Sequence, residues 1–198
     1  PKRSTIVDEF QVGKVADLQY TPSVFGRYNI APTQAVAVVA PSQEGRLLTA
    51  MRWGLIPGWM KPKEGNKAPS GWINARSETA STKPAFRGVF RYRRCIVPAS
   101  GFYEWQKLED GSKQPWLMRS ADEKTMGFAG LWETWMPPDG SELDTVTILT
   151  TSPNSMMEEI HDRMPVILDP DHWDRWMATE PADRSEEHTS ELQSPVPI

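Results

Sequence analysis

The chain has 198 residues, a formal net charge of −4 and a hydrophobic content of 38%, values that fit one water-soluble globular domain with a substantial core. Its single cysteine, Cys95, excludes an internal disulfide and a cysteine-rich metal site. No apolar run is long enough for a membrane-spanning helix and no signal peptide is recognisable, so we expect a cytoplasmic protein without a membrane partner.

Short strands separated by glycine and proline dominate the predicted elements. Helices are expected at Ser4–Phe10, Pro153–Ile160 and Pro170–Met177. Many short strands with few helices indicate an α+β fold, a single domain with a mainly antiparallel, bent, barrel-like β-sheet and a few short flanking helices. The expected strands are Ala35–Ala40, Leu47–Trp53, Arg94–Pro98, Phe102–Lys107, Trp116–Arg119, Gly127–Trp135, Thr145–Thr151 and Met164–Leu168.

A row of polar side chains follows the apolar pair Trp72-Ile73. Asn74, Arg76 and Glu78 stand at alternate positions, and alternate side chains of a strand share one face. An amide, a guanidinium and a carboxylate lined up beside an apolar run suit a site for a polar or anionic ligand. The same row would also fit a solvated strand edge, so these residues alone leave both interpretations open.

A long surface loop is predicted at Pro57–Gly71, where glycine and proline recur. It carries Trp59 beside Lys61 and Lys63, and an exposed aromatic ring next to cations suits base stacking with phosphate contacts. Positive charge clusters again at Arg87–Arg94. Local patches of this kind can hold a phosphate backbone despite the negative net charge, and the alternative is a pair of solvated faces.

Two further residues are candidates for acid–base chemistry. Glu104 lies between Tyr103 and Trp105, and a carboxyl group among aromatic rings can have its pKa raised toward neutrality. His161 is the candidate proton carrier near pH 7, with Asp162 or Glu104 available to orient it. The alternatives are a glutamate on the outward face of a strand and a structural histidine at a helix end.

Cys95 is a weaker candidate nucleophile. It lies in the apolar strand Arg94–Pro98, where a free cysteine is usually a small core residue, although the neighbouring arginines could lower the pKa of its thiol. No pair of histidines or cysteines has the spacing of metal ligands, so we expect no metal and no other cofactor.

Five segments become informative when they are read together. They are Arg27–Thr33 (RYNIAPT), Arg52–Pro57 (RWGLIP), Asn74–Thr79 (NARSET), Arg94–Trp105 (RCIVPASGFYEW) and Ile160–Pro165 (IHDRMP). In this order they resemble the SRAP family, the SOS response-associated peptidase or abasic site processing proteins.

The resemblance implies single-stranded DNA binding and covalent capture of abasic sites. In the family, a cysteine exposed at the N-terminus attacks the ring-opened sugar, and its amine and thiol close a thiazolidine. By the same resemblance, Asn74 holds and polarises that cysteine, Glu104 orients or deprotonates its amine, and His161 moves protons. The DNA-contacting positions that it implies are Pro32, Trp59, Arg76, Thr150 and Arg163, with Arg76 and Arg163 on phosphates.

The chain departs from the family pattern at both ends. It starts at Pro1 without the family's Met-Cys-Gly-Arg, so we expect the nucleophile to be missing and crosslinking by this chain to be absent. The segment after Asp183 has no apolar stripe and is interpreted as a non-native tail. These expectations divide the chain into an SRAP-like domain at 1–183 and a tail at 184–198.

Three functions stay open at this point. The first is an abasic-site crosslinking enzyme of the DNA damage and SOS response, with hydrolase or lyase activity in the intact protein. The second is a non-catalytic single-stranded DNA-binding module, and the third is a cysteine peptidase that uses Cys95 with His161. We expect a monomer that acts in the bacterial cytoplasm and associates with the nucleoid after damage.

Overall fold

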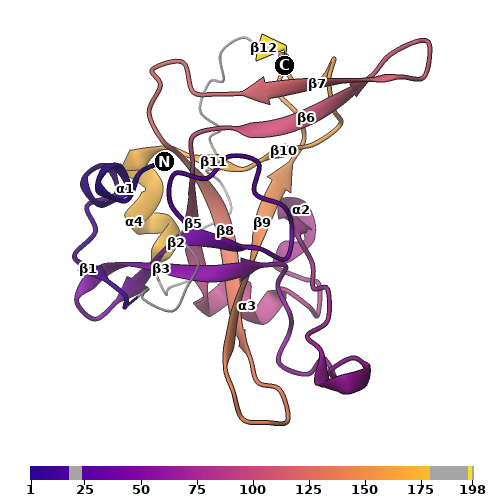
Figure 1. The fold of residues 1–198 in the computed structure, drawn as a ribbon. Coiled ribbons are helices and arrows are strands. Elements are labelled where there is room, and N and C mark those ends of the chain that lie inside the picture. The colour runs from indigo at the N-terminus through magenta and orange to yellow at the C-terminus, as the bar shows by residue number, and fades with distance from the viewer. Residues whose placement is uncertain (18–23, 179–195, 198) are drawn as a thin grey trace.

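Five strands close into a barrel at the centre of the computed structural model, which describes residues 1–17, 24–178 and 196–197 (Figure 1). They are β2 (Ala35–Ser42), β3 (Gly45–Trp53), β5 (Arg94–Ala99), β8 (Met126–Trp135) and β9 (Leu143–Thr151). Neighbours pair antiparallel in the order β3-β2-β5-β8-β9, and a short parallel pairing of β3 with β9 closes the ring. The expected mainly antiparallel, barrel-like sheet is confirmed, although the sheet is mixed: besides β3 with β9, two short strands outside the ring also pair in parallel, one with β3 and one with β9.

Short elements surround this barrel. The hairpin of β6 (Phe102–Lys107) and β7 (Lys113–Met118) projects beyond one end of it (Figure 1). The helices are α1 (Arg3–Glu9), α2 (Ser77–Ala80), α3 (Arg87–Tyr92) and α4 (Trp173–Met177), with 3-10 turns η1 (Glu64–Asn66) and η2 (Pro170–His172). The remaining strands are β1 (Lys14–Val15), β4 (Asn74–Arg76), β10 (Met164–Pro165), β11 (Ile167–Leu168) and β12 (Val196–Pro197).

Alternation along the barrel strands explains why their sequences are almost wholly apolar. Val36 and Val38 pack into the largest core cluster, whereas Ala37 and Val39 pack into a second cluster. That second cluster also contains Phe10, directly after α1, and Trp173, directly after η2. Their rings stack with centroids 4.2 Å apart. Both faces of β2 are therefore covered, and a continuous apolar run is what a strand buried on both faces requires.

Cys95 is part of the core, as its apolar setting predicted. Its side chain is fully buried, and this burial raises the pKa of the Cys95 thiol. A Cβ at Gly130 on the neighbouring strand would lie 2.9 Å from the Cys95 sulfur, so the two strands approach each other too closely there for a larger residue. The thiol is enclosed by packing and has no route to a substrate.

The helix expected at Pro153–Ile160 is absent, and a series of turns stands in its place. The Asn154 side-chain oxygen accepts a hydrogen bond from the Met157 amide at 3.0 Å. A side-chain oxygen that accepts from the amide three residues later is typical of a helix N-cap, and the Glu158 amide also donates to the Asn154 carbonyl at 3.0 Å. The segment therefore forms isolated helical turns that do not continue into a helix. The first helix does form, but its N-terminal cap position is Lys2, and no side chain caps it.

The polar row at Asn74–Glu78 is only partly a strand. β4 ends at Arg76 and α2 begins at Ser77, so Asn74 and Arg76 share a face and Glu78 does not belong to it. Ala75 between them is buried and pairs with Leu149 of β9. The sequence also missed α2 and α3, which are too short to show a helical repeat of apolar residues.

The strand expected at Met164–Leu168 is divided between two neighbours. β10 pairs with β9 and β11 pairs with β8. Val166 joins them, because its amide donates to Leu149 and its carbonyl accepts from Ala129, each at 2.9 Å. The segment that follows His161 is therefore bound to two strands of the barrel, β8 and β9.

Most of the expected tail lies outside the described residues, so its non-native character and the domain limit at 183 stay predictions. Val196 and Pro197 pair with Leu117 and Trp116 at the edge of β7. Within the described parts of the chain, no helix is both long and apolar enough to cross a membrane.

Candidate functional site

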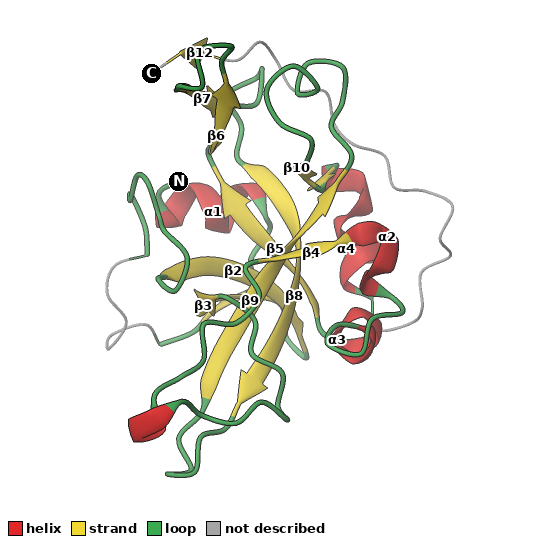
Figure 2. Cartoon of the chain, turned by 90° about the vertical axis from the view of Figure 1, so that its right-hand side faces the viewer, coloured by secondary structure: helices red, strands yellow, loops and turns green. Residues whose placement is uncertain are grey.

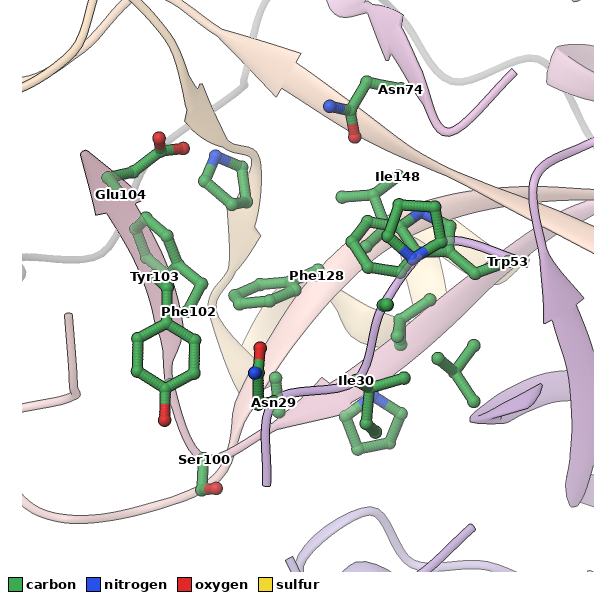
Figure 3. Close-up of a pocket in the computed structure, with 18 of the residues that line it drawn as sticks. Asn29, Ile30, Trp53, Asn74, Ser100, Phe102, Tyr103, Glu104, Phe128 and Ile148 are labelled. Atoms are coloured by element: carbon green, nitrogen blue, oxygen red, sulfur yellow. The ribbon is translucent and has the colours of Figure 1, made fainter. Parts of the chain in front are cut away.

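A cavity of about 720 Å³ opens at the end of the barrel that faces the β6–β7 hairpin (Figure 3). Its floor is apolar and includes Phe128 and Ile148, while Glu104 and Asn74 stand on different walls. A largely apolar hollow with a few polar groups pointing inward is the usual form of a binding site for a small group.

Glu104 and His161 lie side by side in this cavity. Glu104 is carried by β6, His161 follows the turns after β9, and the His161 Nε2 to Glu104 Oε2 distance is 3.8 Å. Burial raises the pKa of the Glu104 carboxyl, and the positive charge of a protonated His161 opposes that rise. The sequence analysis had named Asp162 and Glu104 as residues that could orient His161, and both carboxylates lie close to its ring.

Backbone groups set the orientation of the His161 ring. His161 Nδ1 lies 3.1 Å from both the Arg163 amide and the Arg163 carbonyl. A neutral ring can accept from the amide with its proton on Nε2, which faces Glu104, or donate to the carbonyl with its proton on Nδ1. When the ring is protonated, Nδ1 has acceptors in the Arg163 carbonyl at 3.1 Å and Asp162 Oδ1 at 3.2 Å. Both protonation states thus have partners.

Gln106 ties the two halves of this pair together. Its side-chain amide donates to the carbonyl of Glu159 at 2.8 Å, and its oxygen accepts from the Trp116 indole at 3.0 Å. Glu159 lies two residues before His161, and Gln106 lies two residues after Glu104 on β6. Nothing in the sequence singled out Gln106, because its contact joins residues 53 positions apart.

Asn74 and Arg76 reach the cavity from β4. β4 pairs in parallel with β9, which sets Asn74 beside Ile148 and Arg76 beside Thr150. Both polar side chains are exposed and both line the cavity. This part of the prediction from alternating positions agrees with the structure.

Glu78, which had no assigned role, forms a two-pronged ion pair with Arg163. The Arg163 Nη1 and Nη2 atoms donate to the two Glu78 oxygens at 2.5 and 2.9 Å. Nη2 also donates to the Thr150 carbonyl at 2.5 Å. Hydrogen bonding from Arg163 is the main cause that lowers the pKa of Glu78. Arg163 therefore links α2 and β9 to the segment that carries His161.

Seven of the eight predicted site residues line one cavity. They are Pro32, Asn74, Arg76, Glu104, Thr150, His161 and Arg163. Trp59 lies outside the lining; its ring is 66% exposed and its centroid is 6.3 Å from that of Trp72. The cavity also contains Asn29 and Tyr103, which the sequence analysis left without a role although both lie in the family-like segments.

Metal ligation has no geometric support in this site. No group of three or more histidine, cysteine, aspartate or glutamate side chains within 1–17, 24–178 and 196–197 could hold an ion. The polar groups of the cavity are suited to proton transfer and to holding an oxygen- or nitrogen-bearing group.

The sequence that forms this barrel and cavity matches a known family. The model of the family described as SOS response associated peptidase (SRAP) matches residues 2–197, and the chain belongs to this family. The abasic site processing protein YoqW of Bacillus subtilis (strain 168) is 41% identical over 173 residues, covering 87% of this chain and 74% of that protein.

Two less similar proteins, one compared by sequence and one by structure, match as well. The abasic site processing protein YedK of Escherichia coli (strain K12) is 35% identical over 164 residues, covering 83% of this chain and 70% of that protein. A crystal structure of a protein from Bacteroides thetaiotaomicron is 28% identical with a TM-score of 0.76, covering 88% of this chain and 78% of that one.

Proposed function

We propose that this protein processes abasic sites in single-stranded DNA by forming a covalent link through an N-terminal cysteine carried ahead of Pro1. Membership of the SRAP family and relatives that are named abasic site processing proteins support the substrate. The observation that carries the proposal is the Glu104–His161 pair, which faces a cavity with Asn74 on another wall.

The position of Pro1 supports the delivery of such a cysteine. Pro1 lines the same cavity as Glu104 and His161, and its carbonyl accepts a hydrogen bond from Gly26 at 3.1 Å. A short extension ahead of Pro1 would therefore begin at the cavity. The cavity is large enough for a cysteine and an opened sugar together.

The reaction that we propose joins an aldehyde, an amine and a thiol with loss of one water. The neutral α-amine of the cysteine adds to C1′ of the ring-opened sugar, and the resulting carbinolamine loses its hydroxyl as water to give an imine. The thiol sulfur then adds to the imine carbon, and the nitrogen takes up the thiol proton. A thiazolidine ring results.

The Glu104–His161 pair supplies the proton transfers of this sequence. The raised pKa of Glu104 keeps part of its population protonated closer to neutrality than an ordinary carboxyl group, so it can protonate the departing hydroxyl. The same carboxylate, once ionised, can accept a proton from the α-amine. His161 Nε2, 3.8 Å away, relays protons between Glu104 and solvent, while the Asn74 amide holds the cysteine backbone.

DNA binding in this proposal uses phosphate contacts and stacking. Arg76 is exposed at the cavity rim and would hold a phosphate, while Arg163 contributes through its fixed position beside Thr150. Pro32 and Trp59 would contact the sugar and base faces, which fixes the strand without reading its sequence. The protein would act as a monomer in the bacterial cytoplasm and join the nucleoid after damage.

Crosslinking of an abasic oligonucleotide tests the proposal. The chain is compared with a version in which Met-Cys-Gly-Arg and a short connecting segment precede Pro1, after removal of the initiator methionine. We expect a denaturant-stable adduct with the extended version only. A matched extension with serine in place of cysteine should form none, because it lacks the thiol that closes the ring.

Two outcomes would select the other functions. Salt-sensitive DNA binding without an adduct in the extended version would favour a non-catalytic binding module. An adduct, or peptide cleavage, that is lost in Cys95→Ala would make Cys95 the nucleophile. The full burial of Cys95 and the raised pKa of its thiol argue against that second outcome.

A further inference from the structure

One stretch of the chain carries a charge opposite to that of the rest. Residues 57–93 contain eight lysines and arginines against two glutamates, a net charge of +6, whereas the whole chain has −4. The other residues therefore sum to −10. A basic region on an otherwise acidic protein orients it toward a polyanion and repels that polyanion elsewhere.

The middle of this basic stretch lies at the cavity, and the part that follows leads away from it. β4 carries Arg76 at the cavity rim and continues directly into α2, and α3 lies beyond α2 on the same side of the barrel (Figure 2). A chain of ring contacts joins the surface loop to α3, because Trp59 lies 6.3 Å from Trp72 and Trp72 lies 5.9 Å from Phe86. Phe86 immediately precedes α3.

The outer face of α3 and the residue Lys83 shortly before it are basic. Lys83, Arg87 and Arg91 are exposed, and none of them forms an ion pair within the described residues. Arg87 and Arg91 stand four residues apart, a spacing at which like charges on a helix repel each other. By contrast, Arg93 is neutralised by Glu133 at 3.0 Å and covers the Trp132 ring.

The inner face of α3 fixes these cations in place. Val89 is buried, and Phe90 packs edge-on against Trp176 with ring centroids 6.1 Å apart. Tyr92 at the end of the helix is 64% exposed and offers a free ring face next to Arg91. Cations interleaved with exposed aromatic rings on a rigid support are the usual surface for an unpaired nucleic acid strand.

We propose that the α3 surface, formed by Lys83, Arg87, Arg91 and Tyr92, binds the backbone of the DNA strand where it continues beyond the cavity. This rests on the proposed function, because the strand must first be held at the cavity. The surface adds phosphate contacts without base specificity. It lengthens the strand that the protein covers and leaves the lesion chemistry unchanged.

Salt dependence of binding gives a direct count of such contacts. Binding of undamaged single-stranded oligonucleotides of about 6 and about 20 nucleotides is measured for the chain and for Arg87→Gln/Arg91→Gln. The matched control is Lys113→Gln/Lys124→Gln, which removes the same charge from exposed residues outside 57–93. All four positions are on the surface, so folding should be preserved.

We expect the slope of log K against log salt to fall in magnitude by about 1.4 for the longer oligonucleotide in the α3 variant, since each phosphate contact on a single strand contributes about 0.7. Between about 50 and about 200 mM salt, that variant should lose about sevenfold less affinity than the parent. The short oligonucleotide should show the same slope for both proteins. The control variant should keep the parental slope with both lengths.

Three results would overturn the proposal. The first is an unchanged salt slope in the α3 variant, and the second is an equal change of slope in the control variant. The third is binding of polyglutamate that the α3 variant loses while its DNA slope stays unchanged, which would indicate an acidic protein partner. Adduct formation with a short abasic oligonucleotide, measured on the cysteine-extended version of the same variant, separates the two hypotheses. An adduct with an unchanged slope refutes the α3 surface alone, whereas no adduct in the extended parent refutes the proposed function.

Discussion

Glu104 and Glu78 both face side chains of the short segment His161–Arg163, but they do so with different geometry. Glu78 meets Arg163 through two short hydrogen bonds, and its pKa is lowered. Glu104 meets His161 at 3.8 Å in a more buried setting, and its pKa is raised. A fork-shaped cation at close range fixes a carboxylate in its charged form, whereas burial beside a looser partner keeps a proton available.

The largest effect should come from Glu104→Gln in the cysteine-extended version. The substitution keeps the shape of the side chain and removes its ability to exchange a proton. We expect the rate of adduct formation to fall about 100-fold or more, the usual contribution of an acid–base group. Single-turnover kinetics with an abasic oligonucleotide measure it, and a loss below about threefold would exclude Glu104 from proton transfer.

The same variant should change how stability depends on pH. Because the pKa of Glu104 is higher in the folded chain than in the unfolded chain, the folded state holds the extra proton, and stability falls as pH rises from about 4.3 through the folded pKa. Glu104→Gln removes this loss. Thermal unfolding between about pH 4 and about pH 7 should show the variant gaining on the parent as pH rises. A constant difference would contradict the raised pKa.

Glu78→Gln should affect stability in the opposite direction. It breaks the charged pair with Arg163, and because Glu78 is 46% exposed, solvent limits the loss to about 1 kcal/mol at pH 7. The pKa of Glu78 is lowered, so this stabilisation is present above the unfolded pKa and disappears as pH falls through the folded pKa. Urea unfolding at pH 7 and at about pH 3 measures both parts. An equal loss at both values would show that the charge is irrelevant.

Asp162→Asn should have the smallest effect. Its carboxylate lies 3.2 Å from His161 Nδ1, but the side chain is 85% exposed and the Arg163 backbone serves the same nitrogen. We expect a stability change below about 0.5 kcal/mol and less than about a twofold change in adduct rate. A larger drop in rate would move the orienting role from the Arg163 backbone to Asp162.

The sequence predicted the barrel strands well, because a strand buried on both faces has a continuous run of apolar residues. The apolar runs at Ala35–Ala40 and Arg94–Pro98 lie within β2 and β5 of the structure. It failed at Pro153–Ile160, where Asn154 caps a helical turn that does not continue into the expected helix. It also missed α2 and α3, which have only 4 and 6 residues.

The candidate site divides in the same way. Chemical type and local motif pointed to Glu104, His161 and Asn74, and these line one cavity. Contacts between residues far apart in the chain gave no signal, as with Glu78 and Arg163, separated by 85 positions, and Gln106 and Glu159, separated by 53. Such partners are selected by the folded geometry, which one sequence does not display.

Because Val166 is bound to the barrel, the number of residues between it and Arg163 affects the geometry of the site. Its amide and carbonyl bond to Leu149 and Ala129 on two different strands of the barrel, and only Met164 and Pro165 separate it from Arg163. Inserting or deleting one residue in that interval would turn alternate side chains to the opposite face and move the imidazole away from Glu104 with every functional group still present. In this segment, a change in the number of residues should therefore disturb the site more than most substitutions would.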